Sequence, residues 1–227
     1  ITQSGLKGRG GAGFPTDLKW KLAAGVKDDQ KYVVCNADEG EPGTFKDRYF
    51  LERDPHRFLE GMLVAAWAAG CSEIYIYLRD EYAGCRSILE QELAVLAADP
   101  PCALPAIHLR RGAGAYICGE ESAMIESIEG KRGWPRIKPP FPAVEGVFGF
   151  PTVVNNVETL SCVPHIIERG ADWFTSLGPP HSAGPKLFCI SGPVKRPGCY
   201  EDTMDITVRE LLEREDMGGG MLPGKTG

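Results

Sequence analysis

The sequence predicts an α/β fold in which a mostly parallel sheet carries helices on both of its faces. Two observations support this prediction. Short apolar runs alternate with amphipathic stretches between residues 32 and 130, as strands and crossover helices do in parallel sheets. Glycine, proline or acidic clusters separate most of these segments. With 227 residues, the chain can also bury a core without support from disulfides or metals.

The predicted elements follow in order along the first half of the chain. Residues 32–35 form an apolar run that ends in a polar loop, which is typical of a strand. Asp54 as an N-cap and Pro55 in the first turn begin a helix that Gly70 ends. The same reasoning predicts strands over 74–78 and 106–109, and helices over 81–96 and 119–130.

A long loop and a further helix follow. Residues 131–152 hold five prolines and several aromatic residues between charges, which predicts an ordered loop. A helix is expected over 156–169, and Pro164 should kink it. The character of the chain then changes after residues 178–180, where glycine and two prolines suggest a linker.

The last part of the chain is predicted to begin a second domain. Residues 187–190 predict a strand, and Thr207 with Glu210 forms a capping box for a short helix that ends at Glu213. Neither end of the chain has a closing element, so we expect it to be part of a longer polypeptide. The expected domains are residues 1–182 and residues 183–227.

Composition argues against two classes of function. The net charge is −6 and the pI is near 5.3, whereas a protein that holds phosphate backbones is normally basic. The longest apolar stretch, residues 62–71, is half the roughly 20 residues that a bilayer span needs. The first residues lack the basic and apolar regions of a signal peptide. We therefore expect neither nucleic-acid binding nor direct membrane insertion.

The eight cysteines predict reduced thiols rather than a disulfide or metal framework. No C-x-x-C pair occurs, and the closest two cysteines, Cys189 and Cys199, are ten residues apart. Irregular spacing in a chain of this length is typical of mostly buried thiols in a cytosolic-type compartment. A zinc or iron–sulfur site built from these cysteines alone is not expected.

Two nucleotide-binding patterns occur in contexts that argue against them. Residues 8–13 satisfy G-x-G-x-x-G, but Phe14 and Pro15 follow where the dinucleotide fingerprint needs a helix to open. Residues 219–226 satisfy the P-loop pattern, but they follow a predicted helix and contain Pro223. The glycines of the first pattern still let backbone amides approach a flat or anionic ligand closely.

Four segments combine glycine with carboxylate and amide side chains, and we expect loops at 8–19, 36–43, 112–121 and 154–159. The second and third come directly after predicted strands, where open α/β sheets bind ligands. Asp38, Glu39 and Glu41 suit hydrogen bonds to ribose or ribityl hydroxyls and to the ring nitrogens of a flavin. The alternative for these carboxylates is a solvated acidic loop.

Two cations and two aromatic residues are further candidates. Arg9 and Lys19 could neutralise a phosphate, and ordinary surface charge is the alternative for each. Phe14 and Phe141 lie among glycines and prolines, where a ring could stack on a base. Packing in the core is the alternative for these two side chains.

Four sequence blocks, in order, resemble the signature segments of one family. They are GLKGRGGAGFPT at 5–16, NADEGEPGT at 36–44, GAGAYICGEE at 112–121 and NNVET at 155–159. The family is the NADH-binding FMN flavoprotein subunit of respiratory complex I, with relatives in NAD-dependent formate dehydrogenases and NAD-reducing hydrogenases. The sequence from residue 190 is similar to the start of the family's ubiquitin-like domain.

The resemblance implies a division of the fold. Residues 1–182 would form a Rossmann-like domain that binds FMN and NADH. Residues 183–227 would begin a small ubiquitin-like α+β domain of the soluble-ligand-binding β-grasp type. The family's helical C-terminal domain, whose cysteines hold a [4Fe–4S] cluster, is not part of this sequence. No metal-binding and no catalytic side chain is expected in this chain.

The resemblance also implies roles for individual residues. The glycine loop with Lys19, the 36–39 segment, the 116–121 segment and the 154–159 segment would bind FMN. Phe14 and Phe141 would sandwich the adenine of NADH. The residues expected to bind the two cofactors are Gly8, Arg9, Gly10, Gly11, Ala12, Phe14, Lys19, Asn36, Asp38, Glu39, Glu41, Tyr116, Gly119, Glu120, Glu121, Lys138, Phe141, Val154, Asn155, Asn156 and Thr159.

In this family, the chemistry implied is hydride transfer between nicotinamide C4 and flavin N5, which needs orientation more than acid–base catalysis. The flavin then passes electrons singly to iron–sulfur centres. Glu41, Glu121 and Lys138 would contact the dinucleotide, and the charge of Glu121 would exclude NADPH. A non-catalytic electron-transfer scaffold without flavin, and a P-loop NTPase, are the alternatives of other classes.

Two segments indicate which kind of enzyme complex contains this chain. Residues 45–53 and 121–130 resemble the formate dehydrogenase and hydrogenase relatives more than complex I. We therefore expect the beta subunit of a soluble NAD-dependent formate dehydrogenase. The alternatives are the NADH dehydrogenase subunit of complex I and the diaphorase subunit of an NAD-reducing hydrogenase.

The resemblance also implies partners and a location. The expected partners are a thioredoxin-like [2Fe–2S] subunit and an iron–sulfur-rich electron-carrying subunit. The expected location is the cytoplasm. For a complex I subunit, the expected location is the cytoplasmic or matrix face of the membrane.

Overall fold

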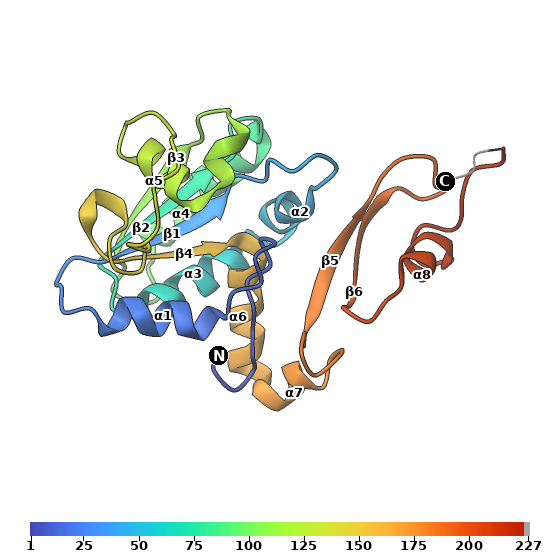
Figure 1. Cartoon of the computed structure of the whole chain (residues 1–227), viewed down its shortest axis with the longest axis horizontal. Helices are drawn as coiled ribbons and strands as arrows, with labels where there is room; N and C mark the ends of the chain where they lie inside the picture. Colours follow the sequence, from blue (N-terminus) through green and yellow to red (C-terminus); the bar gives the residue numbers. More distant parts are fainter. Residues whose placement is uncertain (225–227) are drawn as a thin grey trace.

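A parallel sheet with the strand order β3–β2–β1–β4 forms the centre of the computed structural model, which describes residues 1–224 (Figure 1). Each neighbouring pair of its strands is parallel. The strands are β1 (Tyr32–Ala37), β2 (Glu73–Leu78), β3 (Ala106–Arg111) and β4 (Thr152–Asn156). The predicted mostly parallel sheet is thus confirmed.

Helices cover both faces of this sheet because successive side chains of a buried strand point to opposite sides. On one face, Val33 and Cys35 belong to a core cluster shared with α3, α4 and α6. On the other face, Val34 packs in a second cluster with Met124 and Ile125 of α5. The helices are α1 (Thr16–Gly25), α3 (Pro55–Ala69), α4 (Ala83–Ala98), α5 (Glu121–Ile128) and α6 (Val157–Arg169).

Several local signals hold as predicted. The Asp54 side chain accepts a hydrogen bond from the Arg57 amide at the start of α3, and Gly70 ends this helix in the left-handed conformation. The capping box of Thr207 and Glu210 begins α8 (Val208–Glu213). The helix predicted over 156–169 is α6, and Pro164 lies inside it.

Other segments differ from the prediction. Residues 154–159 are not a loop: they form the end of β4 and the first turn of α6. The segment 8–19 is a loop only to Pro15, because α1 begins at Thr16. The helical segments that were not predicted from the sequence include α2 (Lys46–Arg53), α7 (Ala171–Thr175) and the 3₁₀ turns at Tyr116–Gly119 and Val147–Gly149. β4 was missed because its few apolar residues directly follow the proline-rich loop.

The order of the strands creates a switch point. From β1 the chain moves outward through β2 to β3, and it then returns to place β4 on the opposite side of β1. The segments that leave β1 and β4 therefore diverge, which opens a crevice at the carboxyl ends of these two strands. Ligands of open α/β sheets bind in this crevice.

The packing of α3 on α6 depends on one glycine. A Cβ atom built on Gly61 would lie 2.0 Å from the carbonyl oxygen of Leu160. No side chain fits at this distance, so Gly61 lets the two helices approach closely. This contact supports the N-terminus of α6, which lies beside the crevice.

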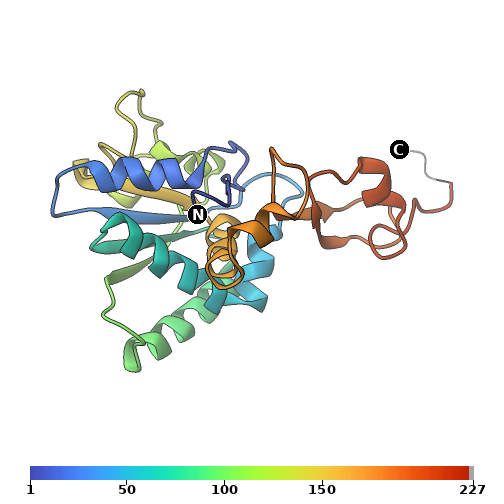
Figure 2. The ribbon, with the colours of Figure 1, turned by 90° about the horizontal axis from the view of Figure 1, so that it is seen from below.

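The C-terminal part forms a separate lobe. The antiparallel strands β5 (Pro185–Ile190) and β6 (Gly198–Thr203) form a two-stranded sheet beside α8. Figure 2 shows this lobe projecting from the α/β domain beyond α6 and α7. No helix within residues 1–224 is long and apolar enough to cross a membrane.

Long-range hydrogen bonds connect the C-terminal lobe and its linker to the α/β domain. The Leu187 amide donates to Glu158 Oε1 at 2.8 Å, and the Arg9 guanidinium donates to the Ala183 carbonyl at 2.7 Å. The Phe45 amide donates to the sulfur of Cys189 at 3.2 Å. The lobe is therefore tied to the domain beside the crevice.

Candidate functional site

A cavity of about 320 Å³ opens at the carboxyl ends of β1 and β4, at the switch point of the sheet. It brings together residues from all four segments that the sequence singled out. The lining residues are Gly10, Asn36, Asp38, Glu39, Gly40, Glu41, Thr44, Lys46, Asp47, Tyr116, Ile117, Gly119, Glu120 and Asn156.

Asn36 and Asp38 form one wall of the cavity. Asn36 Nδ2 donates a hydrogen bond to the Gly119 carbonyl at 2.9 Å, and Asn36 Oδ1 accepts one from the Asp38 amide at 3.1 Å. Asp38 is 8% exposed, and its Oδ2 has no hydrogen-bond partner among residues 1–224. Burial raises the pKa of Asp38 to about 6, although the Arg79 charge opposes this. The wall therefore offers a free acceptor to a ligand hydroxyl.

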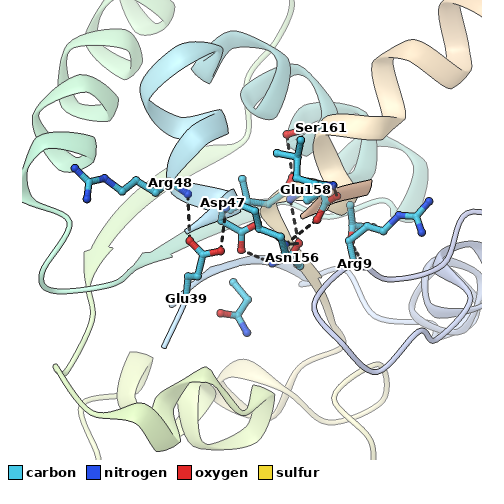
Figure 3. Close-up of polar contacts among 12 residues, drawn as sticks. Arg9, Glu39, Asp47, Arg48, Asn156, Glu158 and Ser161 are labelled. Atoms are coloured by element: carbon cyan, nitrogen blue, oxygen red, sulfur yellow. Dashed lines mark hydrogen bonds and ion pairs between the residues drawn. The ribbon is translucent and has the colours of Figure 1, made fainter. Parts of the chain in front are cut away.

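Glu39 holds the start of α2 in place. Its two carboxylate oxygens accept hydrogen bonds from the amides of Asp47 and Arg48, at 3.0 and 3.3 Å (Figure 3). The Tyr82 hydroxyl donates to the same carboxylate at 3.0 Å. Burial and the nearby Asp47 carboxylate raise the pKa of Glu39. A carboxylate at a helix N-terminus is favoured by the helix dipole, so Glu39 orients α2 toward the cavity.

Lys46, Asp47, Asn156 and Glu158 form a largely buried polar network at the floor of the cavity. Figure 3 labels Asp47, Asn156 and Glu158 of this network. Lys46 Nζ lies 2.8 Å from both Asp47 Oδ1 and Glu158 Oε2. Asn156 Nδ2 donates to Asp47 Oδ2 at 2.6 Å, and Asn156 Oδ1 accepts from the Glu158 amide as the N-cap of α6. Burial would lower the pKa of Lys46, but the two carboxylates outweigh it and raise the pKa. The network thus joins α2 to α6 across the floor.

The glycine loop is closed by its own backbone. Lys7 and Pro15 form an isolated bridge, and the Gly8 amide donates to the Phe14 carbonyl at 2.9 Å. A turn and this bridge precede the glycines, which agrees with the interpretation that they are not a regular dinucleotide fingerprint. A Cβ atom on Gly10 would lie 3.2 Å from Asn156 Cβ. Gly10 therefore presents bare backbone to the cavity.

Arg9 points away from the cavity, toward the C-terminal lobe (Figure 3). The residue is 5% exposed, and its amide donates to Thr159 Oγ1 at 2.8 Å. Its guanidinium donates to Ala183, so the structure places this charge on the linker between the lobes. Thr159 in turn holds the glycine loop through the Arg9 amide.

Lys19 and Asn155 position α1 beside β4. Lys19 Nζ donates to the Val154 carbonyl at 2.9 Å and lies 3.6 Å from Glu121 Oε2. Asn155 Oδ1 accepts a hydrogen bond from the Trp20 indole at 2.7 Å. Lys19 thus connects the strand to the charged residues at the mouth of the cavity.

We call Glu41, Tyr116, Glu121 and Lys138 the rim, because they lie at or beside the mouth of the cavity and are more exposed than its floor. The Tyr116 hydroxyl donates to Glu41. Lys138 Nζ lies 3.1 Å from Glu121 and 2.8 Å from Glu120, whose other oxygen caps α5. The carboxylates outweigh the effect of burial and raise the pKa of Lys138.

The candidate residues thus fall into two groups. Those that line the cavity are Gly10, Asn36, Asp38, Glu39, Glu41, Tyr116, Gly119, Glu120 and Asn156. Those outside its lining are Gly8, Arg9, Gly11, Ala12, Phe14, Lys19, Glu121, Lys138, Phe141, Val154, Asn155 and Thr159. The rings of Phe14 and Phe141 are 43% and 58% exposed, so core packing does not account for either.

Apart from Gly40, four residues that line the cavity were not among the candidates from the sequence. They are Thr44, Lys46, Asp47 and Ile117. The adjacent Lys46 and Asp47 look like an ordinary exposed pair in the sequence, because a buried ion pair and a solvated one have the same composition. Only the missed helix α2 turns them inward.

The second nucleotide pattern, at residues 219–226, follows α8 and a turn rather than a strand. Its Lys225 and Thr226 lie outside the described residues. The part that the structure describes therefore lacks the strand that opens a P-loop.

This chain has a parallel α/β domain with a polar, glycine-lined cavity at its switch point, and this arrangement is typical of nucleotide-binding domains. Residues 1–165 match the family model described as the Nuo51 FMN-binding domain, and residues 187–226 match that of the SLBB domain. The chain belongs to the Nuo51 FMN-binding domain family.

Known relatives support this assignment. The chain is 52% identical to an NADH-quinone oxidoreductase subunit of Rhizobium meliloti, over 99% of this chain and 55% of that protein. It is 51% identical to the NAD-reducing hydrogenase HoxS subunit alpha of Cupriavidus necator, over 93% of this chain and 37% of that protein. The chain therefore spans about half the length of these curated relatives, or less.

A solved structure has the same fold. The crystal structure of an NAD⁺-reducing [NiFe]-hydrogenase in the air-oxidized state superposes with a TM-score of 0.90 at 47% sequence identity. The match covers 97% of this chain and 38% of that chain. This agreement includes the predicted α/β fold.

Proposed function

We propose that this chain is the NADH-binding flavoprotein module of an NAD(H)-dependent oxidoreductase. In this proposal it passes electrons between NAD(H) and iron–sulfur centres through FMN. The observation that carries the proposal is the switch-point cavity, whose buried Asp38 Oδ2 has no hydrogen-bond partner within residues 1–224, in a chain of the Nuo51 FMN-binding family.

The residues present fit FMN. A ribityl chain carries several hydroxyl donors, and Asp38 Oδ2 is a buried acceptor at the cavity. A flat ring needs a wall without side chains, and Gly10 supplies bare backbone to the cavity that Glu39 and Gly40 also line. When bound, FMN supplies the acceptor for a hydride and the route by which electrons leave singly.

In this proposal the chain itself binds and orients. Asn36 fixes the 116–121 segment by its bond to Gly119, and the largely buried polar network holds α2 and α6 at the correct separation. Lys19 lies at the mouth, where its charge suits a phosphate. The exposed rings of Phe14 and Phe141 are the proposed stacking surfaces for adenine, and Glu41, Glu121 and Lys138 the proposed contacts to the dinucleotide.

An absorbance spectrum of the purified full-length protein tests this proposal. Bound FMN should give a band near roughly 450 nm that NADH bleaches. Asp38→Ala should lose at least about tenfold in FMN affinity, as expected for a charge-assisted hydrogen bond. Asp29→Ala removes an exposed aspartate outside the cavity and should keep the flavin. A folded protein that binds no FMN would instead support the non-catalytic scaffold.

The narrower proposal concerns the holoenzyme. The named relatives are subunits of NADH-quinone oxidoreductases and of an NAD-reducing hydrogenase, and this supports a place in a larger complex. The 45–53 and 121–130 segments favour the beta subunit of an NAD-dependent formate dehydrogenase. The proposed partners are a thioredoxin-like [2Fe–2S] subunit and an iron–sulfur-rich subunit. NAD⁺ reduction by formate, but not by hydrogen, in the purified complex tests this assignment.

We also propose that the chain divides into an FMN- and NADH-binding domain over 1–182 and the start of a β-grasp domain over 183–227. The separate sheet of β5 and β6 supports this division. Limited proteolysis of the full-length protein should cut first near residues 178–184, where the chain passes between the lobes.

A further inference from the structure

Cys189 on β5 and Cys199 on β6 lie directly opposite each other in the antiparallel ladder. Residues opposed in this way have Cα atoms about 4.5 to 5.5 Å apart, within the range of about 4.4 to 6.8 Å that a disulfide spans. The backbone therefore already places the two cysteines within the range of a disulfide.

The surroundings make the two thiols different. The neighbouring Cys199 thiol and the Phe45 amide, which donates to the Cys189 sulfur, lower the pKa of Cys189 to about 7. The neighbouring Cys189, together with burial, raises the pKa of Cys199. Cys189 is thus the better nucleophile near neutral pH, and Cys199 keeps its proton.

Cys189 is also accessible. It lines a second cavity of about 520 Å³, formed by residues 42–44 and Lys46 with residues 186–191 and two leucines of α8. Both cysteines of the pair are partly exposed, whereas Cys35 and Cys162 are buried and burial raises the pKa of each. A small oxidant can therefore reach Cys189 before these buried thiols.

We propose that Cys189 and Cys199 form a reversible thiol–disulfide pair that is oxidised by hydrogen peroxide. The Cys189 thiolate attacks one peroxide oxygen, the O–O bond breaks, and hydroxide leaves and is protonated to water. Cys189 is now a sulfenic acid. The Cys199 sulfur then attacks the Cys189 sulfur, the S–O bond breaks, and the departing hydroxide takes the Cys199 proton. Two thiols and one peroxide thus give one disulfide and two waters, and an added dithiol reverses the change.

Oxidation alters a contact between the lobes. The Phe45 amide, at the start of α2, donates to the Cys189 sulfur, and a disulfide sulfur is a weaker acceptor than a thiolate. The following residues, Lys46 and Asp47, belong to the floor of the first cavity. The redox state of the thiol pair therefore changes a hydrogen bond between the two lobes, next to the floor of the first cavity.

Peptide mapping of the full-length protein tests the pair. The reduced protein is treated with hydrogen peroxide, its remaining thiols are alkylated, and it is digested with trypsin without reductant. Peptides 187–195 and 196–209 each contain one cysteine of the pair, so we expect them joined and two hydrogens lighter than their sum. Prior treatment with a dithiol should separate them. The proposal is overturned when both peptides are recovered alkylated and unlinked after oxidation.

Three variants test the assigned roles. In Cys199→Ser the sulfenic acid at Cys189 has no resolving thiol, so dimedone should trap it at position 189. In Cys189→Ser the dimedone adduct at Cys199 should be at least about tenfold lower, because burial still raises the pKa of that thiol and the Phe45 amide donates at position 189, not at position 199. Equal adducts in the two variants would overturn the assignment of the nucleophile. Cys102→Ser, which removes an exposed cysteine of the α/β domain, should leave the 187–195 to 196–209 link unchanged.

Discussion

The floor and the rim of the switch-point cavity both consist of charged residues, but they hold these charges differently. In the floor, the Lys46 and Asp47 side chains are 9% and 3% exposed. In the rim, Lys138 and Glu121 are 28% and 27% exposed. A buried pair that loses one partner leaves an uncompensated charge, whereas a pair near water is worth little. The floor therefore sets the shape of the cavity, and the rim is free to exchange its partners for a ligand.

The largest effect is expected from breaking the floor. Lys46→Met leaves the buried Asp47 and Glu158 carboxylates without their cation, which should lower the free energy of unfolding by about 3–5 kcal/mol. Urea denaturation measures this change. Lys21→Met removes an exposed partner of Asp17 and should cost about 0–1 kcal/mol. Equal losses in the two variants would contradict the distinction between buried and exposed pairs.

The next largest effect on stability is expected at the contact between α3 and α6, which supports the floor. Gly61→Ala places a Cβ atom against the Leu160 carbonyl and should destabilise the protein by about 1–3 kcal/mol, because α3 and α6 must separate. In Gly84→Ala, in α4, the added Cβ atom meets no atom of residues 1–224 within 4 Å, so this variant should instead be more stable by about 0.5–1 kcal/mol. Thermal unfolding of both variants shows whether their effects have opposite signs.

The wall between floor and rim should respond to pH. Burial raises the pKa of Asp38 to about 6 from an ordinary value of 3.8, so the folded state binds this proton more tightly than the unfolded state does. The contribution of Asp38 to stability therefore falls as the pH rises from about 4 to about 6. Asp38→Asn removes this dependence.

Urea denaturation of the flavin-free protein measures it. The variant should gain stability relative to the parent across this pH interval, and the difference should be constant at higher pH. Parallel profiles for the two proteins would contradict the raised pKa.

The smallest effect on stability is expected at the rim. Glu121→Gln should change the free energy of unfolding by less than about 0.5 kcal/mol, because the carboxylate is partly exposed. Its proposed role is to repel the additional phosphate of NADPH. Removal of a repulsion of about 1 kcal/mol should improve kcat/KM for NADPH relative to NADH roughly fivefold. Glu145→Gln, at an exposed glutamate of the proline-rich loop, is the control. An unchanged ratio would argue against that role.

The differences between floor and rim also explain which residues the sequence could predict. Asp38 and Asn36 were predicted because they follow a recognisable strand, and Asn156 because it lies in an amide-rich block. Lys46 and Asp47 were not, because α2 has few apolar residues and the carboxylate of Glu39 that caps it lies seven residues before its start. The contact of the Arg9 guanidinium with the linker was not predicted for a similar reason, because its acceptor, Ala183, is distant in the sequence.

Local patterns were sufficient for β1, β2 and β3 of the parallel sheet and for the helix caps, whereas the resemblance of four sequence blocks to a known family indicated the class of ligand. Apolar periodicity and capping residues act over a few positions, so a single sequence displays them directly. The position of β4 beside β1 depends on long-range pairing, and so does the burial of the ions beneath the cavity. Whether a charge is solvated or enclosed depends on segments more than a hundred residues apart, and only the folded chain brings them together.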